Sequence, residues 1–140
     1  MQQTVSTNIA ALILRVTSGS AFIAHGLLKL LVFTPAGTAG FFESLGLPGF
    51  LAYLTIFAEL AGGAALILGV ATRVVALALL PVLLGAAWVH SGNGWLFSAE
   101  GGGWEFPVFW AMIQVVIMAL GSGAYALRLP VVDRVLGQAA

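Results

Sequence analysis

Two ionisable residues, His25 and Lys29, stand four positions apart inside a strongly apolar stretch of the sequence. In a helix this spacing places both side chains on one face, a turn apart. An imidazole can donate, accept or transfer a proton near neutral pH, and an ammonium group can donate hydrogen bonds or pair with a carboxylate. Such groups are costly in an apolar environment, so they must have partners elsewhere in the chain. The pattern indicates a site for proton or hydrogen-bond chemistry.

The composition is that of an integral membrane protein. Of the 140 residues, 61% are hydrophobic and only 7% are charged, with a mean hydropathy of +1.08, whereas soluble domains are about one quarter charged. Five basic and five acidic residues give a formal net charge of zero, which argues against nucleic acid as a partner. The absence of cysteine excludes thiol chemistry, a cysteine-ligated iron–sulfur cluster and a cysteine-type zinc site within this chain. No metal site is predicted.

The spans are expected to be helices, because lipid permits only helices or closed barrels and the sequence lacks the alternation of a barrel. We predict a single membrane domain over residues 1–140, an all-α bundle of four transmembrane helices. Their expected ranges are 9–33, 50–70, 74–90 and 106–125. A short helix between the first two spans, capped by Thr38 and ended by Gly46 and Pro48, is expected to lie in the membrane interface. No cleaved signal peptide is expected, because Arg15 falls inside the first apolar run.

The basic residues predict an orientation. With four spans, Arg15, Arg73, Arg128 and Arg134 fall on one side of the membrane and only Lys29 lies near the other. The positive-inside rule then places both termini in the cytoplasm. Tryptophans commonly anchor helices at the interface, and four gather at the outer side: Trp88, Trp95, Trp104 and Trp110.

The depths of the ionisable groups can be compared across spans. At about 1.5 Å of rise per residue, His25 lies about 12 Å from the outer end of the first span, and Glu59 lies about 13 Å from that of the second. The two spans run antiparallel, so both side chains reach nearly the same level. Gly62 and Gly63 follow Glu59 by one helical turn and lie on the same side of the helix. Small residues mark close contacts between helices, so the Glu59 carboxylate should point into the bundle. We therefore predict a polar pocket within apolar walls in the outer half of the bundle.

The candidate site residues are the polar and aromatic side chains expected near this pocket. The candidate catalytic residues are His25, Lys29 and Glu59. The candidate binding residues are His25, Glu59, His90, Asn93, Trp88, Glu105 and Gln114. Intramembrane ionisable groups are functional by default, but a charged pair between helices can also simply fix their register. Asn93 also fits a turn with Gly94, and Arg15 and Arg73 fit determinants of orientation.

Several motifs, in order along the chain, resemble the DoxX family. The resemblance covers about residues 10–128. The motifs are His25-Gly26-Leu27-Leu28-Lys29-Leu30, Ala39-Gly40-Phe41-Phe42-Glu43-Ser44-Leu45-Gly46-Leu47-Pro48, Ala58-Glu59-Leu60-Ala61-Gly62-Gly63, Gly69-Val70-Ala71-Thr72-Arg73, His90 with Asn93-Gly94, and Gly102-Gly103-Trp104-Glu105-Phe106-Pro107. The resemblance implies a small four-helix inner-membrane protein that works with redox enzymes, since the family is named for a relative of a membrane subunit of thiosulfate:quinone oxidoreductase.

The leading hypothesis is a membrane component of an oxidoreductase system that binds a quinone or small redox substrate. It would contact the lipid bilayer and either a protein partner from a redox complex or a second copy of the chain. His25 and Lys29 could donate to the quinone carbonyls, and Glu59 could hold the imidazole tautomer or accept a proton. Electrons would come from a partner or directly from a substrate.

Three other functions remain open. The first is a non-catalytic membrane anchor or assembly partner for a redox enzyme complex, in which the pocket charges only fix helix register. The second is a carrier for a small polar solute, although four spans without inverted repeats make a weak transporter. The third is haem binding by His25 and His90, which is disfavoured because their expected depths differ by about 12 Å.

Overall fold

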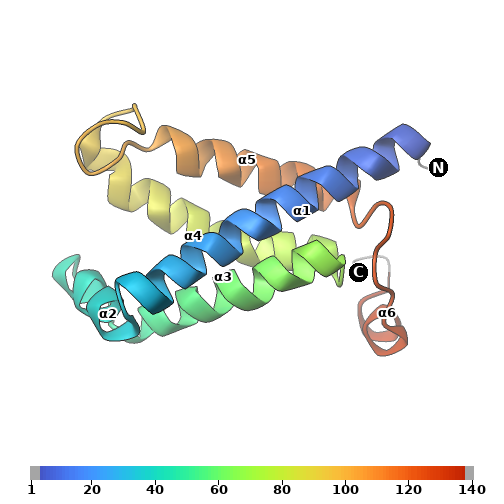
Figure 1. Ribbon diagram of the computed structural model, residues 1–140, viewed down its shortest axis with the longest axis horizontal. Helices are drawn as coiled ribbons and strands as arrows, with labels where there is room; N and C mark the ends of the chain where they lie inside the picture. The colour runs from blue at the N-terminus through green and yellow to red at the C-terminus, as the bar shows by residue number, and fades with distance from the viewer. Residues whose placement is uncertain (1–3, 138–140) are drawn as a thin grey trace.

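The computed structural model describes residues 4–137, and all regular structure in that range is helical. Four long helices form the bundle, and shorter ones lie at its two ends (Figure 1). The all-α prediction is confirmed. The elements are α1 (Val5–Leu27), the π-helical turn η1 (Leu28–Val32), α2 (Pro35–Ser44), α3 (Phe50–Leu68), α4 (Thr72–His90), the 3-10 turn η2 (Ser91–Asn93), α5 (Glu105–Leu120) and α6 (Pro130–Leu136).

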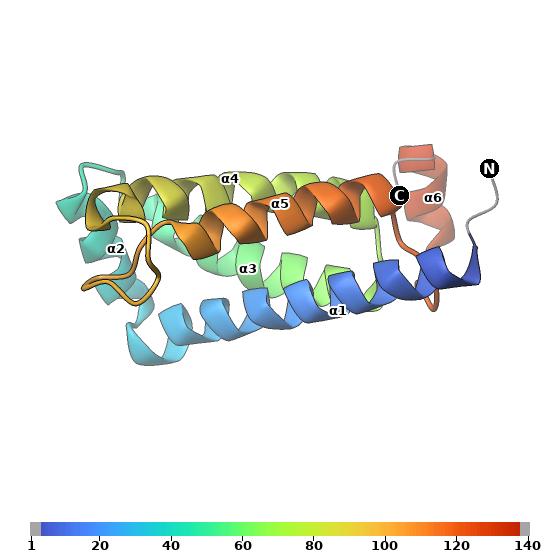
Figure 2. The same cartoon turned by 90° about the horizontal axis from the view of Figure 1, so that it is seen from above.

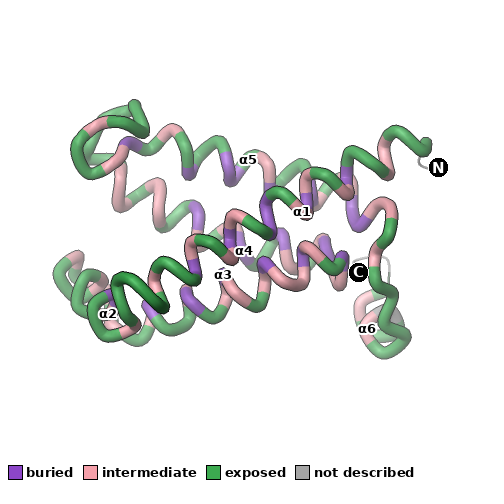
Figure 3. The backbone as a smooth tube through the Cα atoms, viewed as in Figure 1, coloured by how far each residue is buried: buried purple, intermediate pink, exposed green. Residues whose placement is uncertain are grey.

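Three segments are long and apolar enough to cross a membrane: Val5–Val32, Phe50–Leu68 and Thr72–Asn93. The fourth long helix, α5, is apolar but has only 16 residues and ends at Leu120, so it is shorter than the predicted 106–125. Apolar side chains also cover the outside of the bundle, where Phe57 is 70% exposed and Phe109 is 65% exposed. Figure 3 shows these exposed faces along the helices. A surface of this kind suits lipid, and the chain is a multi-pass membrane protein.

The long helices run alternately up and down. The start of α1, the α3–α4 link and α6 lie at one end, which we call the α6 end (Figures 1 and 2). The last turn of α1, helix α2 and the segment 91–104 lie at the other end, which we call the α2 end. Helix α1 packs mainly on α3, and α4 packs mainly on α5. The antiparallel arrangement expected for the first two spans is therefore present.

The predicted short helix after the first span is present as α2, but its cap differs from the prediction. The Thr34 hydroxyl accepts a hydrogen bond from the Gly37 amide at 3.1 Å, and Pro35 occupies the first helical position. Proline suits that position because its nitrogen has no hydrogen to leave unpaired. The predicted cap, Thr38, lies inside α2, where its hydroxyl donates to the Thr34 carbonyl at 2.9 Å.

Glycines allow α1 and α3 to touch backbone to backbone. A Cβ on Gly19 would lie 2.6 Å from the Gly63 carbonyl oxygen, and a Cβ on Gly63 would lie 2.7 Å from the Gly19 carbonyl oxygen. No larger residue fits either position without moving a helix. The small-residue face predicted beside Glu59 therefore does mark a close helix contact. Its other glycine, Gly62, faces Leu79 of α4 instead.

Arg15 ties the bundle together at the α6 end. Its side chain is fully buried. The guanidinium donates to the carbonyls of Leu66 and Ile67 in the last turn of α3, and to those of Ser122 and Ala124 after α5. Carbonyls at a helix C-terminus carry partial negative charge, so they suit a buried cation. The role of Arg15 as a determinant of orientation stays a prediction. The structure adds that its charge lies inside the protein and links α1 to the end of α3 and to the segment after α5.

We expect Arg15→Leu to lower the free energy of unfolding by about 3 kcal/mol or more, because four carbonyl groups lose a charged donor. Arg15→Lys should cost less, since it keeps the charge but loses the planar fork. Unfolding of the purified protein in detergent micelles would measure both. The exposed Arg128 provides the matched control, as Arg128→Leu, and an equal effect of the two leucine variants would contradict the proposed tie.

Candidate functional site

A cavity of about 690 Å³ lies inside the bundle toward the α2 end. Helices α1, α2, α3, α4 and α5 and the loop after α4 all contribute to its walls. Most of the lining is aliphatic, aromatic, proline or glycine. The polar lining residues are His25, Lys29, Thr55, Glu59 and His90. The predicted combination of apolar walls with a few polar groups is therefore present.

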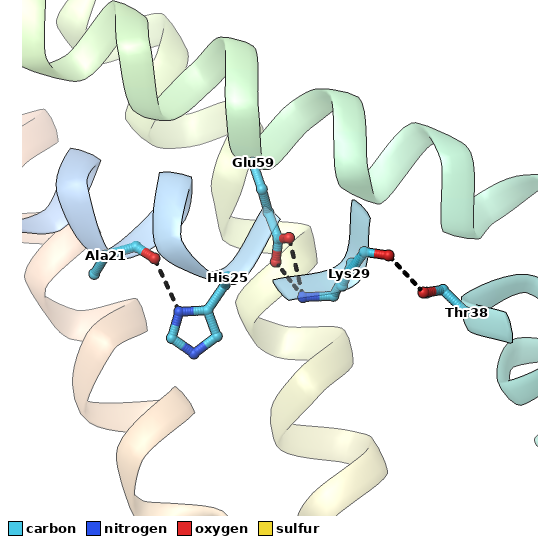
Figure 4. A network of polar contacts seen from close by, with 5 residues as sticks. All are labelled: Ala21, His25, Lys29, Thr38 and Glu59. Carbon is cyan, nitrogen blue, oxygen red and sulfur yellow. Dashed lines mark hydrogen bonds and ion pairs between the residues drawn. The ribbon is translucent and has the colours of Figure 1, made fainter. Parts of the chain in front are cut away.

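The central polar contact is an ion pair between Lys29 and Glu59. The Lys29 ammonium donates to both carboxylate oxygens of Glu59, at 2.9 Å and 3.0 Å (Figure 4). The side chain of Glu59 is 5% exposed and that of Lys29 is 19% exposed. Glu59 therefore points into the bundle, as predicted, and it meets a basic side chain of the first span.

Local backbone features bring the two charged side chains together. Lys29 lies in the π-helical turn η1, where the wider turn changes the direction of the side chain relative to a continuous α-helix. On the same face, Gly26 lies against α3, and a Cβ there would be 3.2 Å from the Cβ of Glu59 and 2.8 Å from Leu60. A larger residue at position 26 would push α3 away and separate the pair.

His25 lines the same cavity but bonds to a different partner from the one predicted. Its Nδ1 lies 2.9 Å from the carbonyl oxygen of Ala21, one turn earlier in α1 (Figure 4). A carbonyl can only accept, so Nδ1 carries the hydrogen and the other ring nitrogen, Nε2, is an acceptor in the neutral ring. The Ala21 carbonyl, and not the Glu59 carboxylate, holds the tautomer. The imidazole also packs against Trp110 and Phe106, at centroid distances of 5.1 Å and 6.4 Å.

His90 lines the cavity and also holds the loop at its α2 end. Its Nδ1 lies 3.0 Å from the carbonyl oxygens of both Gly101 and Gly102. The Asn93 side-chain amide donates to the same two carbonyls at 3.0 Å and 2.9 Å. Both glycines have positive φ, of 79° and 76°, which larger residues rarely adopt. Asn93 therefore fixes the loop and does not line the cavity.

Glu105 also acts on this loop. One carboxylate oxygen of Glu105 accepts a hydrogen bond from the Phe97 amide at 3.0 Å, and Phe97, Gly102 and Gly103 line the cavity. The next glycine is required sterically, because a Cβ on Gly103 would lie 2.2 Å from the Leu96 carbonyl oxygen. The loop that closes the α2 end of the cavity is thus held by His90, Asn93 and Glu105.

Like Asn93 and Glu105, the predicted binding residues Trp88 and Gln114 do not line the cavity. Trp88 is 55% exposed on the outside of α4, which fits its alternative role as a membrane anchor. Gln114 is fully buried and donates to the Ser18 hydroxyl, which also accepts a hydrogen bond from the Trp110 indole nitrogen at 2.7 Å. Gln114 and Trp110 are therefore linked through their shared acceptor, the Ser18 hydroxyl.

The aromatic wall beside His25 was not predicted from the sequence. Trp110 was expected among the interfacial tryptophans, but it is only 7% exposed and packs against Phe22 at a centroid distance of 4.3 Å. The four-residue spacing of Phe106, Trp110 and Gln114 could have placed all three on one inward face. Phe106 and Trp110 also line a smaller apolar groove of about 260 Å³ between α1 and α5.

The described residues, 4–137, contain no group of three or more His, Cys, Asp or Glu side chains that could hold a metal ion. The cavity wall carries four ionisable groups, namely two imidazoles, one ammonium and one carboxylate, together with the Thr55 hydroxyl, and the rest of its lining is apolar or aromatic. Such an arrangement suits a hydrophobic ligand with a small number of oxygen atoms.

The sequence model of the DoxX family matches residues 10–92, which include all four of these groups. The chain belongs to the DoxX family. The match to the DoxX model ends before α5, so the aromatic wall formed by Phe106 and Trp110 lies outside it.

A similar curated protein is a Bacillus subtilis protein named "Putative oxidoreductase CatD". It is 43% identical to this DoxX-family chain over 81 residues, which are 58% of this chain. The matched region is 59% of the length of that relative, so the chain spans less than two thirds of it. No solved structure matches this chain.

We expect Glu59→Gln to lower the free energy of unfolding by about 3 kcal/mol, because it leaves the Lys29 ammonium without a counter-charge in an apolar environment. Lys29→Met should do the same to Glu59, whereas the double variant should cost less than the sum of the two. Unfolding of all three in detergent micelles gives the coupling free energy. Glu100→Gln, at an exposed position, is the matched control. Additive effects would mean that the pair does not stabilise the bundle.

Proposed function

We propose that this DoxX-family protein is the membrane component of an oxidoreductase system and that its cavity binds a quinone or a small redox substrate of similar chemistry. The observation that carries the proposal is the cavity itself, which combines apolar walls with His25, Lys29, Glu59 and His90. The relative named as an oxidoreductase adds support for the redox class. The quinone is the more specific part of the proposal.

The dimensions and walls of the cavity support a quinone as the ligand. Small-molecule sites in proteins commonly measure about 300–1,000 Å³, and this cavity, of about 690 Å³, falls in that range. Phe106 and Trp110 would stack against the ligand ring, and the aliphatic side chains of α3 and α4 would contact its tail. The groove between α1 and α5 shares these two aromatic residues, so a long tail could continue along it toward lipid.

The polar residues would serve the reduction or oxidation of the ligand. Reduction of a quinone takes up two electrons and two protons. Lys29 would donate a hydrogen bond to a ligand oxygen, while His25 and Glu59 would exchange protons with it. A redox partner protein, or the substrate of that partner, would supply or remove the electrons.

A second candidate is a non-catalytic anchor or assembly partner for a redox enzyme complex. Two observations favour it. The charges of Lys29 and Glu59 satisfy each other, as in a purely structural pair. The loop at the α2 end also exposes large apolar side chains, with Trp95 58%, Leu96 53% and Phe97 68% exposed, which suits contact with a protein partner.

For the placement in the cell, we propose the inner membrane of a bacterium with the α6 end in the cytoplasm. Arg73, Arg128 and Arg134 lie toward the α6 end and carry the positive-inside argument without Arg15. Helix α2 would then lie in the outer interface, as would the exposed tryptophans Trp88 and Trp95.

Binding of a decyl-substituted benzoquinone to the purified protein in detergent micelles tests the proposal. We expect saturable binding that His25→Ala and Glu59→Gln each weaken about tenfold, because each removes a polar partner of the ligand. Phe57→Leu, on the lipid-facing side of α3, should bind as the unmodified protein does. Absence of binding, or binding that both cavity variants leave unchanged, would favour the anchor instead.

A further inference from the structure

We propose that the cavity binds the hydroquinone, the reduced ligand with two hydroxyl groups, more tightly than the quinone; this inference rests on the proposed function. It follows from the hydrogen-bonding character of His25 and His90. Backbone carbonyls hold Nδ1 of both imidazoles, which leaves Nε2 of each neutral ring as an acceptor, and both residues line the cavity. A quinone has only acceptor oxygens, whereas each hydroquinone hydroxyl can donate.

The His25 ring is fixed from within its own helix. The Ala21 carbonyl at 2.9 Å requires the hydrogen to be on Nδ1. The ring's other nitrogen, Nε2, points away from Ala21 and from the Lys29–Glu59 pair (Figure 4). His25 lines the cavity together with Trp110 and Phe106, which flank its ring. In its neutral form, His25 therefore offers a ligand one acceptor nitrogen beside an aromatic wall.

The His90 ring is fixed in the same sense from a different part of the chain. Its Nδ1 lies 3.0 Å from the carbonyl oxygens of Gly101 and Gly102, so Nδ1 again carries the hydrogen. These carbonyls are themselves held in place by the Asn93 amide. His90 is the last residue of α4, whereas His25 lies in α1, and both line the cavity. Two imidazoles from two different helices therefore line a single cavity.

Lys29 is the donor among the charged groups of the cavity. Its ammonium has three hydrogens, and its contacts with the two Glu59 oxygens leave one available to a ligand. A quinone carbonyl can accept from Lys29 but has nothing to give to either imidazole. A hydroquinone hydroxyl can accept from Lys29, and a hydroxyl can also donate to Nε2 of whichever imidazole it reaches, His25 or His90. The reduced form can therefore form hydrogen bonds with more of the polar groups in the cavity than the quinone can.

The expected preference follows from the number of hydrogen bonds gained. A neutral hydrogen bond contributes about fivefold to affinity, so one or two additional bonds give a preference of about tenfold for the hydroquinone. Tighter binding of the reduced form raises the midpoint potential of the bound couple. For a two-electron couple, a tenfold preference corresponds to about 30 mV.

Anaerobic titration calorimetry of the full-length protein in micelles tests the inference, with a decyl-substituted benzoquinone and its hydroquinone as the two ligands. We expect the hydroquinone to bind about tenfold more tightly. His25→Phe and His90→Phe keep an aromatic ring but remove the acceptor, so each should reduce the preference mainly by weakening the binding of the hydroquinone. Phe57→Leu is the control that should keep the full preference.

The outcomes separate this inference from the function on which it rests. Equal affinities, or tighter binding of the quinone, would overturn the preference and leave quinone binding in place. Binding of neither ligand would overturn the proposed function and the preference together. The preference is measured by comparing the affinities of the two ligands for the unmodified protein. A histidine variant that fails to fold therefore does not affect the test.

Discussion

The ion pair between Lys29 and Glu59 is the interaction on which the α2 end of this bundle depends. A carboxylate that is almost fully buried among apolar side chains cannot remain charged without a partner. The partner of Glu59 is the Lys29 ammonium, which lies in the turn after α1 with its Nζ 2.9 Å from a carboxylate oxygen. The pair fixes the register of α1 against α3, which Gly26 then allows to approach closely. It also leaves both charges at the wall of the cavity, where a ligand can reach them. Stability and any chemistry at the site are therefore linked through the same two side chains.

Buried charges are stabilised by different partners at the two ends of the bundle. At the α6 end, the Arg15 guanidinium donates to four backbone carbonyls, which hold α1 to the end of α3 and to the segment after α5. At the α2 end, the charges pair across helices, and a cavity of about 690 Å³ remains between them and the loop. The loop is in turn held by His90, Asn93 and Glu105. One end of the molecule thus provides rigidity, and the other provides a space for a ligand.

The sequence was sufficient for the features that follow from periodicity and charge. Long apolar runs predicted the helices, and the cost of Glu59 in lipid, together with its small neighbours, predicted that it faces the first span. The sequence could not show which backbone carbonyl accepts a hydrogen bond from each polar side chain, because every residue has a backbone carbonyl and residue types do not distinguish them. For this reason the Ala21 partner of His25 and the four acceptors of Arg15 were missed. Trp110 was misplaced because it was grouped with the other tryptophans by residue type, and not by its four-residue spacing from Phe106 and Gln114.

Arg15 has a mechanical consequence for the distant cavity. It lies ten residues before His25 in the same helix, about 15 Å along the axis, and it joins α1 to the ends of α3 and α5. The Lys29–Glu59 pair joins α1 and its last turn to α3 again at the other end, so these two helices are held together on both sides of His25. Any widening that admits a bulky ring would then have to come from the other walls of the cavity, which are α4, α5 and the loop 91–104.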